Sequence, residues 1–184
     1  DDDSDPELIT WLKNLRTPEN ISINYTVNKF EKGQAGNVNS AFYASKYEQL
    51  ILMHDDDFFL PGGIDHLSEA WHRSEPDIDA CYGFQSICNN DGEIDENATR
   101  KNNYSYFRRA EKIGEQASPV WAALVGQFPN NGFMIRRSIA LEVGYPTEKE
   151  VGRHPVDFHF GVRYATASTR PFVLLPERTT AYRK

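Results

Sequence analysis

Residues 49–57 read QLILMHDDD, an apolar run that leads directly into one histidine and three aspartates. Such a continuous apolar run is typical of a strand buried in a parallel sheet. Apolar runs at 133–135 and 172–175 and an alternating run at 21–27 predict further strands, and amphipathic segments between them predict helices. Strands that alternate with helices indicate an α/β fold with a mostly parallel sheet flanked by helices.

The composition is that of a soluble globular protein. The chain has 184 residues, 39% of them hydrophobic and 26% charged, and this size suits one domain over residues 1–184. A net charge of -7 disfavours a general nucleic-acid partner, because the surface repels phosphate. The longest apolar run, at 50–53, is too short for a membrane-spanning helix. We expect a cytoplasmic protein, in which any membrane association comes from segments outside this sequence.

The acidic end of the run at 49–57 is the strongest candidate for a site. In open α/β sheets, ligands bind beyond the carboxyl ends of the strands. The neighbouring carboxylates of residues 55–57 repel one another, and a bound cation removes that cost. Their hard oxygen atoms suit Mg²⁺ or Mn²⁺. The alternative is a solvated acidic turn that caps the next helix.

Two further clusters carry potential chemistry. Residues 1–5 read DDDSD, which could meet a base or ribose or could be an acidic terminus with a helix cap. Residues 153–157 read RHPVD, and Asp157 falls near the start of an expected helix over 156–166, where the helix dipole favours its charged form. A lone aspartate there is more often a cap or an ion-pair partner. The polar segment 88–103 is expected to contain a turn.

Taken together, these clusters and several short motifs resemble the family 2 glycosyltransferases, which are inverting enzymes with a GT-A-type, Rossmann-like fold. The first motifs resemble the nucleotide-sugar half of that family and the later ones its acceptor-side half, so the resemblance divides the chain into residues 1–88 and 89–184. The motifs, in chain order, are DDS (2–4), GNVN (36–39), LILMHDDDFFLP (50–61), NNGFMIRR (130–137), VG (143–144), VD (156–157) followed by Arg163, and TAYR (180–183).

The resemblance implies roles for residues in the first half. Asp2 matches the carboxylate that meets the nucleotide base, usually uracil, and Asn39 matches the asparagine that opens a helix at the nucleotide-sugar site. Asp55 is expected near the ribose. Because the family's first strand and helix precede its DDxS motif, we expect this chain to be a fragment of a longer protein.

The resemblance also implies a metal ion, Mn²⁺ or Mg²⁺. Asp56 matches the metal-binding carboxylate of the family's DxD motif, which also serves nucleotide-sugar binding. His54 stands where that motif has its first aspartate, so Asp55 or Asp57 is expected to share the metal with Asp56.

In the second half, Asp157 matches the catalytic base, which takes a proton from the acceptor hydroxyl as that oxygen attacks the anomeric carbon. Arg153, His154 or Arg163 could add positive charge near the phosphates or orient the acceptor. The implied donor is a nucleotide-diphosphate sugar, usually a UDP-sugar. The acceptor could be a glycan, a lipid-linked sugar or a protein, as in polysaccharide biosynthesis.

Two other functions stay open at this stage. A nucleotidyltransferase also places carboxylates and Mg²⁺ after a strand, and it would release pyrophosphate instead of a nucleoside diphosphate. A non-catalytic sugar- or metal-binding module of the same fold would bind its ligand without turnover.

Overall fold

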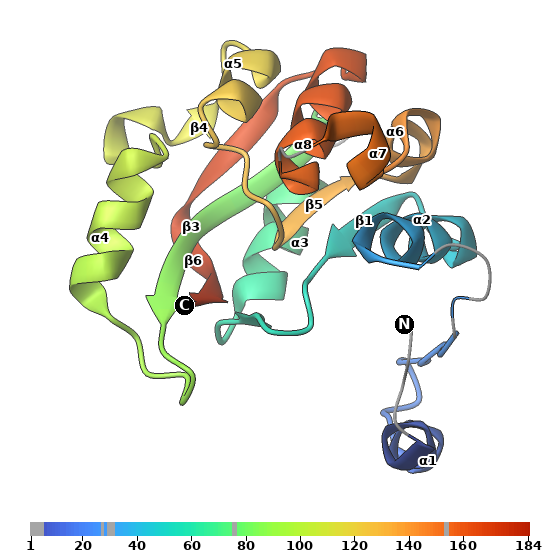
Figure 1. The fold of residues 1–184 in the computed structure, drawn as a ribbon. Helices are drawn as coiled ribbons and strands as arrows, with labels where there is room; N and C mark the ends of the chain where they lie inside the picture. Colours follow the sequence, from blue (N-terminus) through green and yellow to red (C-terminus); the bar gives the residue numbers. More distant parts are fainter. Residues whose placement is uncertain (1–5, 27, 29–31, 75–76, 153–154) are drawn as a thin grey trace.

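The computed structural model describes residues 6–26, 28, 32–74, 77–152 and 155–184. A mixed sheet lies between helices that cover both of its faces (Figure 1). The helices are α1 (Pro6–Asn14), α2 (Gln34–Ala44), α3 (Gly63–Ser74), α4 (Glu96–Ser105), α5 (Pro119–Leu124), α6 (Arg137–Val143), α7 (Glu148–Val151), α8 (Val156–Ala167) and a short 3₁₀ helix (Ala110–Lys112). The strands are β1 (Gln49–Leu52), β2 (Phe58–Phe59), β3 (Ala80–Cys88), β4 (Gly114–Glu115), β5 (Phe133–Arg136) and β6 (Phe172–Arg183).

The strands run in the order β1-β5-β3-β6-β2, and β4 also pairs with β6. Strands β3 and β6 are parallel, whereas the pairs β1–β5, β3–β5, β2–β6 and β4–β6 are antiparallel. The α/β fold class is confirmed, but within the described ranges the sheet is mixed rather than mostly parallel. Strand β5 lies between β1 and β3 and opposes both. Its direction depends on long-range pairing, which an apolar run does not encode.

Alternate residues of the central strands build two separate cores. Tyr82 of β3 and Phe133 of β5 belong to a core under α2, α6 and α8, whereas Cys81 and Met134 face the opposite side, under α3. This division follows from the two-residue period of a strand. Trp71 of α3 is completely buried in the second core. Burial on both faces therefore explains why these strands read as apolar runs.

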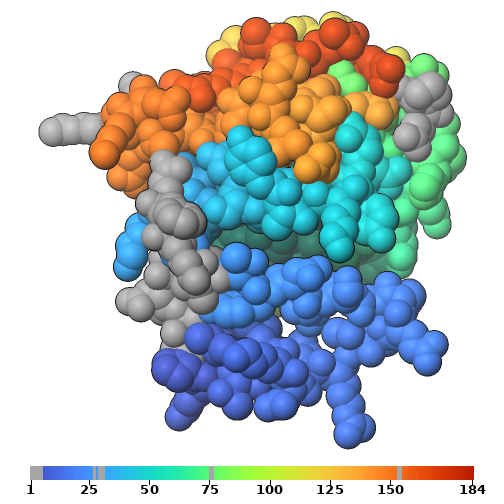
Figure 2. Space-filling model, turned by 90° about the vertical axis from the view of Figure 1, so that its right-hand side faces the viewer, coloured from blue at the N-terminus to red at the C-terminus, as the bar shows by residue number. Residues whose placement is uncertain are grey.

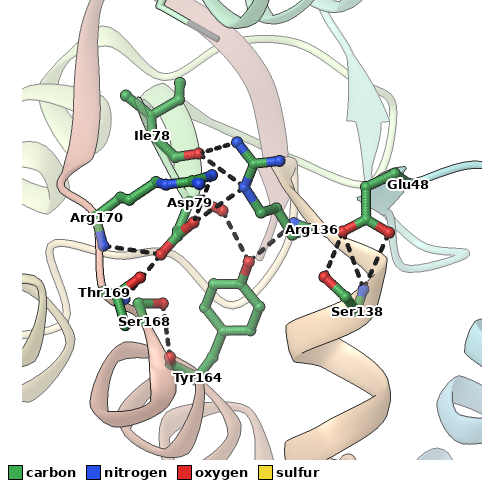
Figure 3. A network of polar contacts seen from close by, with 9 residues as sticks. All are labelled: Glu48, Ile78, Asp79, Arg136, Ser138, Tyr164, Ser168, Thr169 and Arg170. Atoms are coloured by element: carbon green, nitrogen blue, oxygen red, sulfur yellow. Dashed lines mark hydrogen bonds and ion pairs between the residues drawn. The ribbon is translucent and has the colours of Figure 1, made fainter. Parts of the chain in front are cut away.

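A buried ion pair fixes the start of β3 against β5 and α8 (Figure 3). Asp79 accepts hydrogen bonds from Arg136 Nε at 3.0 Å and from the backbone N–H groups of Thr169 and Arg170, each at 2.9 Å. The Tyr164 hydroxyl donates to the Asp79 carbonyl at 2.7 Å and accepts from Arg136 N at 2.8 Å. Every oxygen of Asp79 is thus bonded within the fold, so this carboxylate serves the architecture.

The N-terminal segment departs from expectation. Residues 21–26 form neither helix nor strand, so the strand predicted over 21–27 is wrong for the part of it that the structure describes. Their apolar–polar alternation suits a strand, but a strand also needs a neighbouring strand for its backbone groups, and none of the described strands pairs with them. Figure 1 shows α1 apart from the other helices, and Figure 2 shows the N-terminal segment as a layer along one side.

The polar segment after β3 contains a helix that its composition conceals. Asp95 caps α4 by accepting hydrogen bonds from the N–H groups of Asn97 and Ala98, each at 2.9 Å. On the buried side of α4, Thr99 Oγ1 accepts from Ile87 N at 2.8 Å, and Asn103 Oδ1 accepts from Gln85 N at 3.1 Å. The polar face of α4 therefore binds the backbone of β3 and fixes the position of Gln85.

The sheet interleaves the two expected halves of the chain. Strands β1, β2 and β3 come from residues 1–88, and β4, β5 and β6 come from residues 89–184. Among the helices in the described ranges, none combines the length and apolarity that a membrane crossing needs.

Candidate active site

Asp157 lies in the first turn of α8, where neutral side chains from two distant segments hold one of its oxygens. Gln34 Nε2, at the start of α2, donates to Asp157 Oδ1 at 2.7 Å. The Tyr145 hydroxyl, which follows α6, donates to the same oxygen. Within the described part of the chain, Oδ2 has no hydrogen-bond partner. The side chain is 23% exposed, so this carboxylate is fixed at one oxygen and open at the other.

Tyr145 is in turn fixed by Asn39 of α2. Asn39 Oδ1 accepts from Tyr145 N at 2.7 Å, and Asn39 Nδ2 donates to the Tyr145 carbonyl at 2.9 Å. Burial raises the pKa of Tyr145, and the charge and hydrogen bond of Asp157 raise it further, so the hydroxyl stays a donor. Both polar atoms of the Asn39 amide are engaged here, while its expected contact with a nucleotide remains a prediction.

His54 joins this group from the end of β1. Its Nε2 lies 3.6 Å from Asp157 Oδ1 and 3.4 Å from Gln34 Nε2. This nitrogen can accept from the glutamine in one tautomer and face the carboxylate as a donor in the other. The histidine in the DxD-like motif therefore connects the acidic residues after β1 with the expected base.

Asp57 is the buried member of the acidic motif. Its Oδ1 accepts from Arg183 N at 2.8 Å, and its Oδ2 accepts from Asn131 Nδ2. Asn131 reaches it through a tight turn, because Gly132 has a φ of 69° and a Cβ there would lie 2.3 Å from Thr180 Cγ2. Asn131 Oδ1 is buried and has no hydrogen-bond partner in the described ranges. The NNG motif thus positions an unsatisfied oxygen beside Asp57.

His54, Asp56 and Asp57 could together hold a metal ion. One ligand atom from each lies within 4.8 Å of the others. Asp56 is exposed, and its carbonyl accepts from Arg183 Nε at 2.8 Å. Two carboxylates and an imidazole form a reasonable donor set for a divalent cation.

A cleft of about 420 Å³ opens beside Asp157. Residues from β3, α5, α8 and the end of β6 line it, and its surface is mostly apolar. The lining residues include Gln85, Arg108, Phe128, Asp157, Phe158 and Tyr182. Neither His54 nor the acidic residues 55–57 lie among the lining residues, so Asp157 stands between the cleft and the acidic cluster.

A comparison with known protein families identifies the family of this chain. The model of "Glycosyl transferase family 2" matches residues 1–143, which is well over half of the chain. The chain belongs to glycosyl transferase family 2. This membership confirms the expected family, and the α/β sheet with helices on both faces agrees with its GT-A-type fold.

Solved structures support the same fold for this family 2 chain. It is similar to S. aureus TarS 1-349 in complex with UDP-GlcNAc, with a TM-score of 0.65 and 12% identity over 97% of this chain and 45% of that one. Against another structure of S. aureus TarS 1-349 the TM-score is 0.55 and the identity 11%, over 79% of this chain and 38% of that one. This chain therefore spans less than half of either structure. A search of curated proteins found no match.

The structure brings some predicted site residues together and separates others. Asp56, Asp57 and Asp157 surround His54. Asp55 is exposed and stands outside the possible metal group. Arg163 forms an ion pair with Glu150 at 3.1 Å and does not line the cleft. The remaining predicted residues, Asp2, Arg153 and His154, lie outside the described residues.

Three residues of this family 2 site escaped the sequence analysis. Asn131 and Tyr145 lie in or directly after the quoted NNGF and VG motifs, so those motifs could have indicated them. No sequence pattern indicated Gln34, because it contacts Asp157 across a sequence separation of 123 residues.

Proposed function

We propose that this chain is the catalytic part of an inverting glycosyltransferase that moves a sugar from a nucleotide-diphosphate sugar to an acceptor hydroxyl. One observation carries the proposal: Asp157 lines a cleft, Gln34 and Tyr145 fix one of its oxygens, and the other has no hydrogen-bond partner among the described residues. A general base needs this combination of fixed geometry and an accessible lone pair.

The proposed reaction needs one base. Asp157 Oδ2 accepts the proton of the acceptor hydroxyl while the hydroxyl oxygen forms a bond to the anomeric carbon on the face opposite the leaving group. The bond from that carbon to the diphosphate breaks, and the nucleoside diphosphate leaves with the electron pair. Tyr145 and Gln34 keep Asp157 Oδ1 in place during the transfer, so that the free oxygen points the same way at each turnover.

A divalent cation fits the residues around His54. Asp56 and Asp57 offer carboxylate oxygens, and His54 offers an imidazole nitrogen. Asn131, whose Oδ1 has no hydrogen-bond partner in the described ranges, lies next to Asp57. Mg²⁺ strongly prefers oxygen ligands, whereas imidazole suits transition metals, so this donor set favours Mn²⁺ of the two expected ions. When bound, the ion would neutralise charge that develops on the diphosphate leaving group.

A UDP-sugar is the donor that we infer. The family resemblance points to uracil recognition, and the similar TarS structure was solved in complex with UDP-GlcNAc. At 12% identity the two chains share a fold, so the donor sugar of this chain is a question for a screen. The acceptor class remains a glycan, a lipid-linked sugar or a protein.

Release of UDP from UDP-GlcNAc, with water or a glycan as acceptor, tests the proposed reaction. Asp157→Asn should lower the release rate roughly 10²–10⁴-fold, which is the usual contribution of a general base. Asp65→Asn is the matched control, because Asp65 is exposed in the first turn of α3 and should leave the rate unchanged. An unchanged rate in Asp157→Asn would rule out the base assignment.

The products and the ligand affinity separate the other functions. Pyrophosphate release would indicate a nucleotidyltransferase, and UDP-GlcNAc binding without any release would indicate a binding module. Calorimetric titration of UDP-GlcNAc with and without Mn²⁺ tests the metal. Asp56→Ala should remove the Mn²⁺-dependent part of the affinity, and Asp91→Ala, in an exposed loop, should not.

A further inference from the structure

The cleft beside Asp157 contains a buried arginine, Arg108. The Arg108 side chain donates to the backbone carbonyls of Gln127 at 2.9 Å and Gly126 at 3.0 Å, and to Gln85 Oε1 at 3.0 Å. The residue is 3% exposed. Across the described ranges, no aspartate or glutamate forms an ion pair with it.

A buried charge without an ionised partner is costly. The three hydrogen-bond acceptors around Arg108 are neutral, and the Tyr106 ring, 5.5 Å from the guanidinium carbon, is a weaker cation–π partner. Burial lowers the pKa of Arg108 to about 10, which still leaves the group charged at neutral pH. Buried charges are normally paired, so the fold keeps a positive charge here that an anion would stabilise.

Gln85 adds a buried amide donor to the same wall of the cleft. Its Oε1 is occupied by Arg108, whereas its Nε2 is buried and has no hydrogen-bond partner among the described residues. Gln85 is 4% exposed and lines the cleft together with Arg108 and Asp157. Buried donors without partners are rare in folded proteins, and a ligand acceptor is one way to satisfy them.

The rest of the cleft suits a sugar ring. Ala123, Phe128, Pro129 and Phe158 give it apolar walls, and such walls can cover the C–H face of a pyranose. The acidic cluster of His54, Asp56 and Asp57 lies outside the cleft, on the other side of Asp157. The cleft is therefore the acceptor side of the expected base, away from the group that could hold the metal.

We propose that this cleft binds a sugar acceptor that carries an anionic group, a carboxylate or a phosphate, and that Arg108 and Gln85 recognise that group. The proposal rests on the proposed function and makes it specific: the acceptor is a charged sugar. The guanidinium forms strong, directional hydrogen bonds with both kinds of anion.

Binding of three simple probes to the unaltered chain tests the proposal. Methyl β-glucuronide carries a carboxylate, glucose 6-phosphate carries a phosphate, and methyl β-glucoside is neutral. At least one charged probe should bind about tenfold or more tightly than the neutral one in calorimetric or ligand-observed NMR titrations. The stronger charged probe identifies the anion. Equal binding of all three probes, or no binding, would contradict the proposal.

A pair of neighbouring arginines provides the matched variants. Arg108→Gln should abolish the preference for the charged probe, whereas Arg109→Gln removes the same charge from a residue that does not line the cleft and should keep it. Thermal unfolding of each variant establishes that it is folded. If Arg108→Gln does not fold, Arg108→Lys replaces it and should weaken the preference, because lysine cannot bind an anion through two parallel hydrogen bonds.

Donor titrations on the same protein keep the two proposals distinguishable. UDP-GlcNAc binding without a preference for charged probes would reject the anionic acceptor and leave the proposed function standing. A preference for charged probes without UDP-GlcNAc binding or UDP release would reject the proposed function and support only an anion site. A preference for UDP-glucuronate over UDP-GlcNAc, with equal binding of the methyl glycosides, would indicate that the chain recognises an anionic donor sugar. This result would contradict the acceptor assignment.

Discussion

Asp79 and Asp157 are both held by hydrogen bonds, yet their surroundings differ in charge. Asp79 is 2% exposed; Arg136 contacts one of its oxygens, and two backbone N–H groups bind the other (Figure 3). Asp157 is partly exposed, and Gln34 and Tyr145 hold its Oδ1 as neutral donors.

The difference separates a structural carboxylate from one suited to chemistry. At Asp79 the Arg136 guanidinium faces the charge, and both carboxylate oxygens accept hydrogen bonds inside the fold, so neither is available to a substrate. At Asp157, which lines the cleft, the neutral donors fix Oδ1 without cancelling the charge, and Oδ2 has no hydrogen-bond partner in the described part of the chain. Four predictions test this comparison, in order of decreasing effect.

The largest effect is expected at the buried ion pair. Asp79→Ala should lower the free energy of unfolding by about 3–5 kcal/mol, because it removes the carboxylate that faces the Arg136 guanidinium and accepts from two buried backbone N–H groups. Urea unfolding measures this loss. Asp77→Ala, at an exposed position two residues earlier, should change stability by less than about 0.5 kcal/mol. A loss below about 1 kcal/mol in Asp79→Ala would contradict the structural role of Asp79.

The second effect concerns the orientation of the base. Tyr145→Phe removes a hydrogen bond to a charged group, worth about 1.5–3 kcal/mol, and should lower UDP release roughly 10- to 100-fold. The affinity for UDP-GlcNAc should stay unchanged, because Tyr145 is proposed to act only through Asp157. Tyr43→Phe, at an exposed position on α2, is the control. Equal activity of both variants would show that Asp157 needs no fixed orientation.

The third prediction concerns the pH dependence of stability, which involves buried groups near Asp79 and near Asp157. Burial raises the pKa of Cys81 from 9.0 to about 12 and also raises the pKa values of Tyr145 and Tyr164 above their usual 10.0. The folded chain therefore keeps protons that the unfolded chain loses, so stability is full below pH 9 and falls as the pH rises.

For Cys81 alone, the loss between pH 9 and pH 10 is about 1 kcal/mol, because the unfolded thiol is already half ionised at pH 9. Thermal unfolding from pH 8 to pH 10 should therefore show a falling midpoint. Cys81→Ala should flatten the first part of that decline, and a flat profile in the unaltered chain would contradict the raised pKa values.

The smallest effect is expected for the stability of Asp157→Asn. Because an asparagine oxygen can accept the same hydrogen bonds from Gln34 and Tyr145, and because the side chain is partly exposed and lies 3.6 Å from the His54 imidazole, the substitution should change the free energy of unfolding by about 0.5 kcal/mol or less. Urea unfolding beside Asp79→Ala makes the contrast direct. If Asp157→Asn lost several kcal/mol of unfolding free energy, Asp157 would also have a structural role. This result would contradict the contrast with Asp79.

Local sequence patterns predicted much of the fold. The run QLILM produced β1, and the apolar residues at 133–135 and 172–175 lie within β5 and β6. Local patterns failed where the outcome depended on a partner. Residues 21–26 alternate correctly but pair with no described strand, and β5 opposes both of its neighbours. The polar helix α4 was missed because it contacts β3 through hydrogen bonds instead of an apolar face.

The residues of the candidate site divide in the same way, into those that local patterns indicated and those that only the fold brings together. The sequence by itself determined the acidic motif after β1, the expected base at the start of α8 and the family resemblance, because these depend on residues close together in the chain. Only the tertiary structure decided which groups surround them: Gln34 and Tyr145 at Asp157, Asn131 at Asp57, and Gln85 with Arg108 in the cleft. Those contacts join residues from separate helices and strands, and the packing of the sheet determines them.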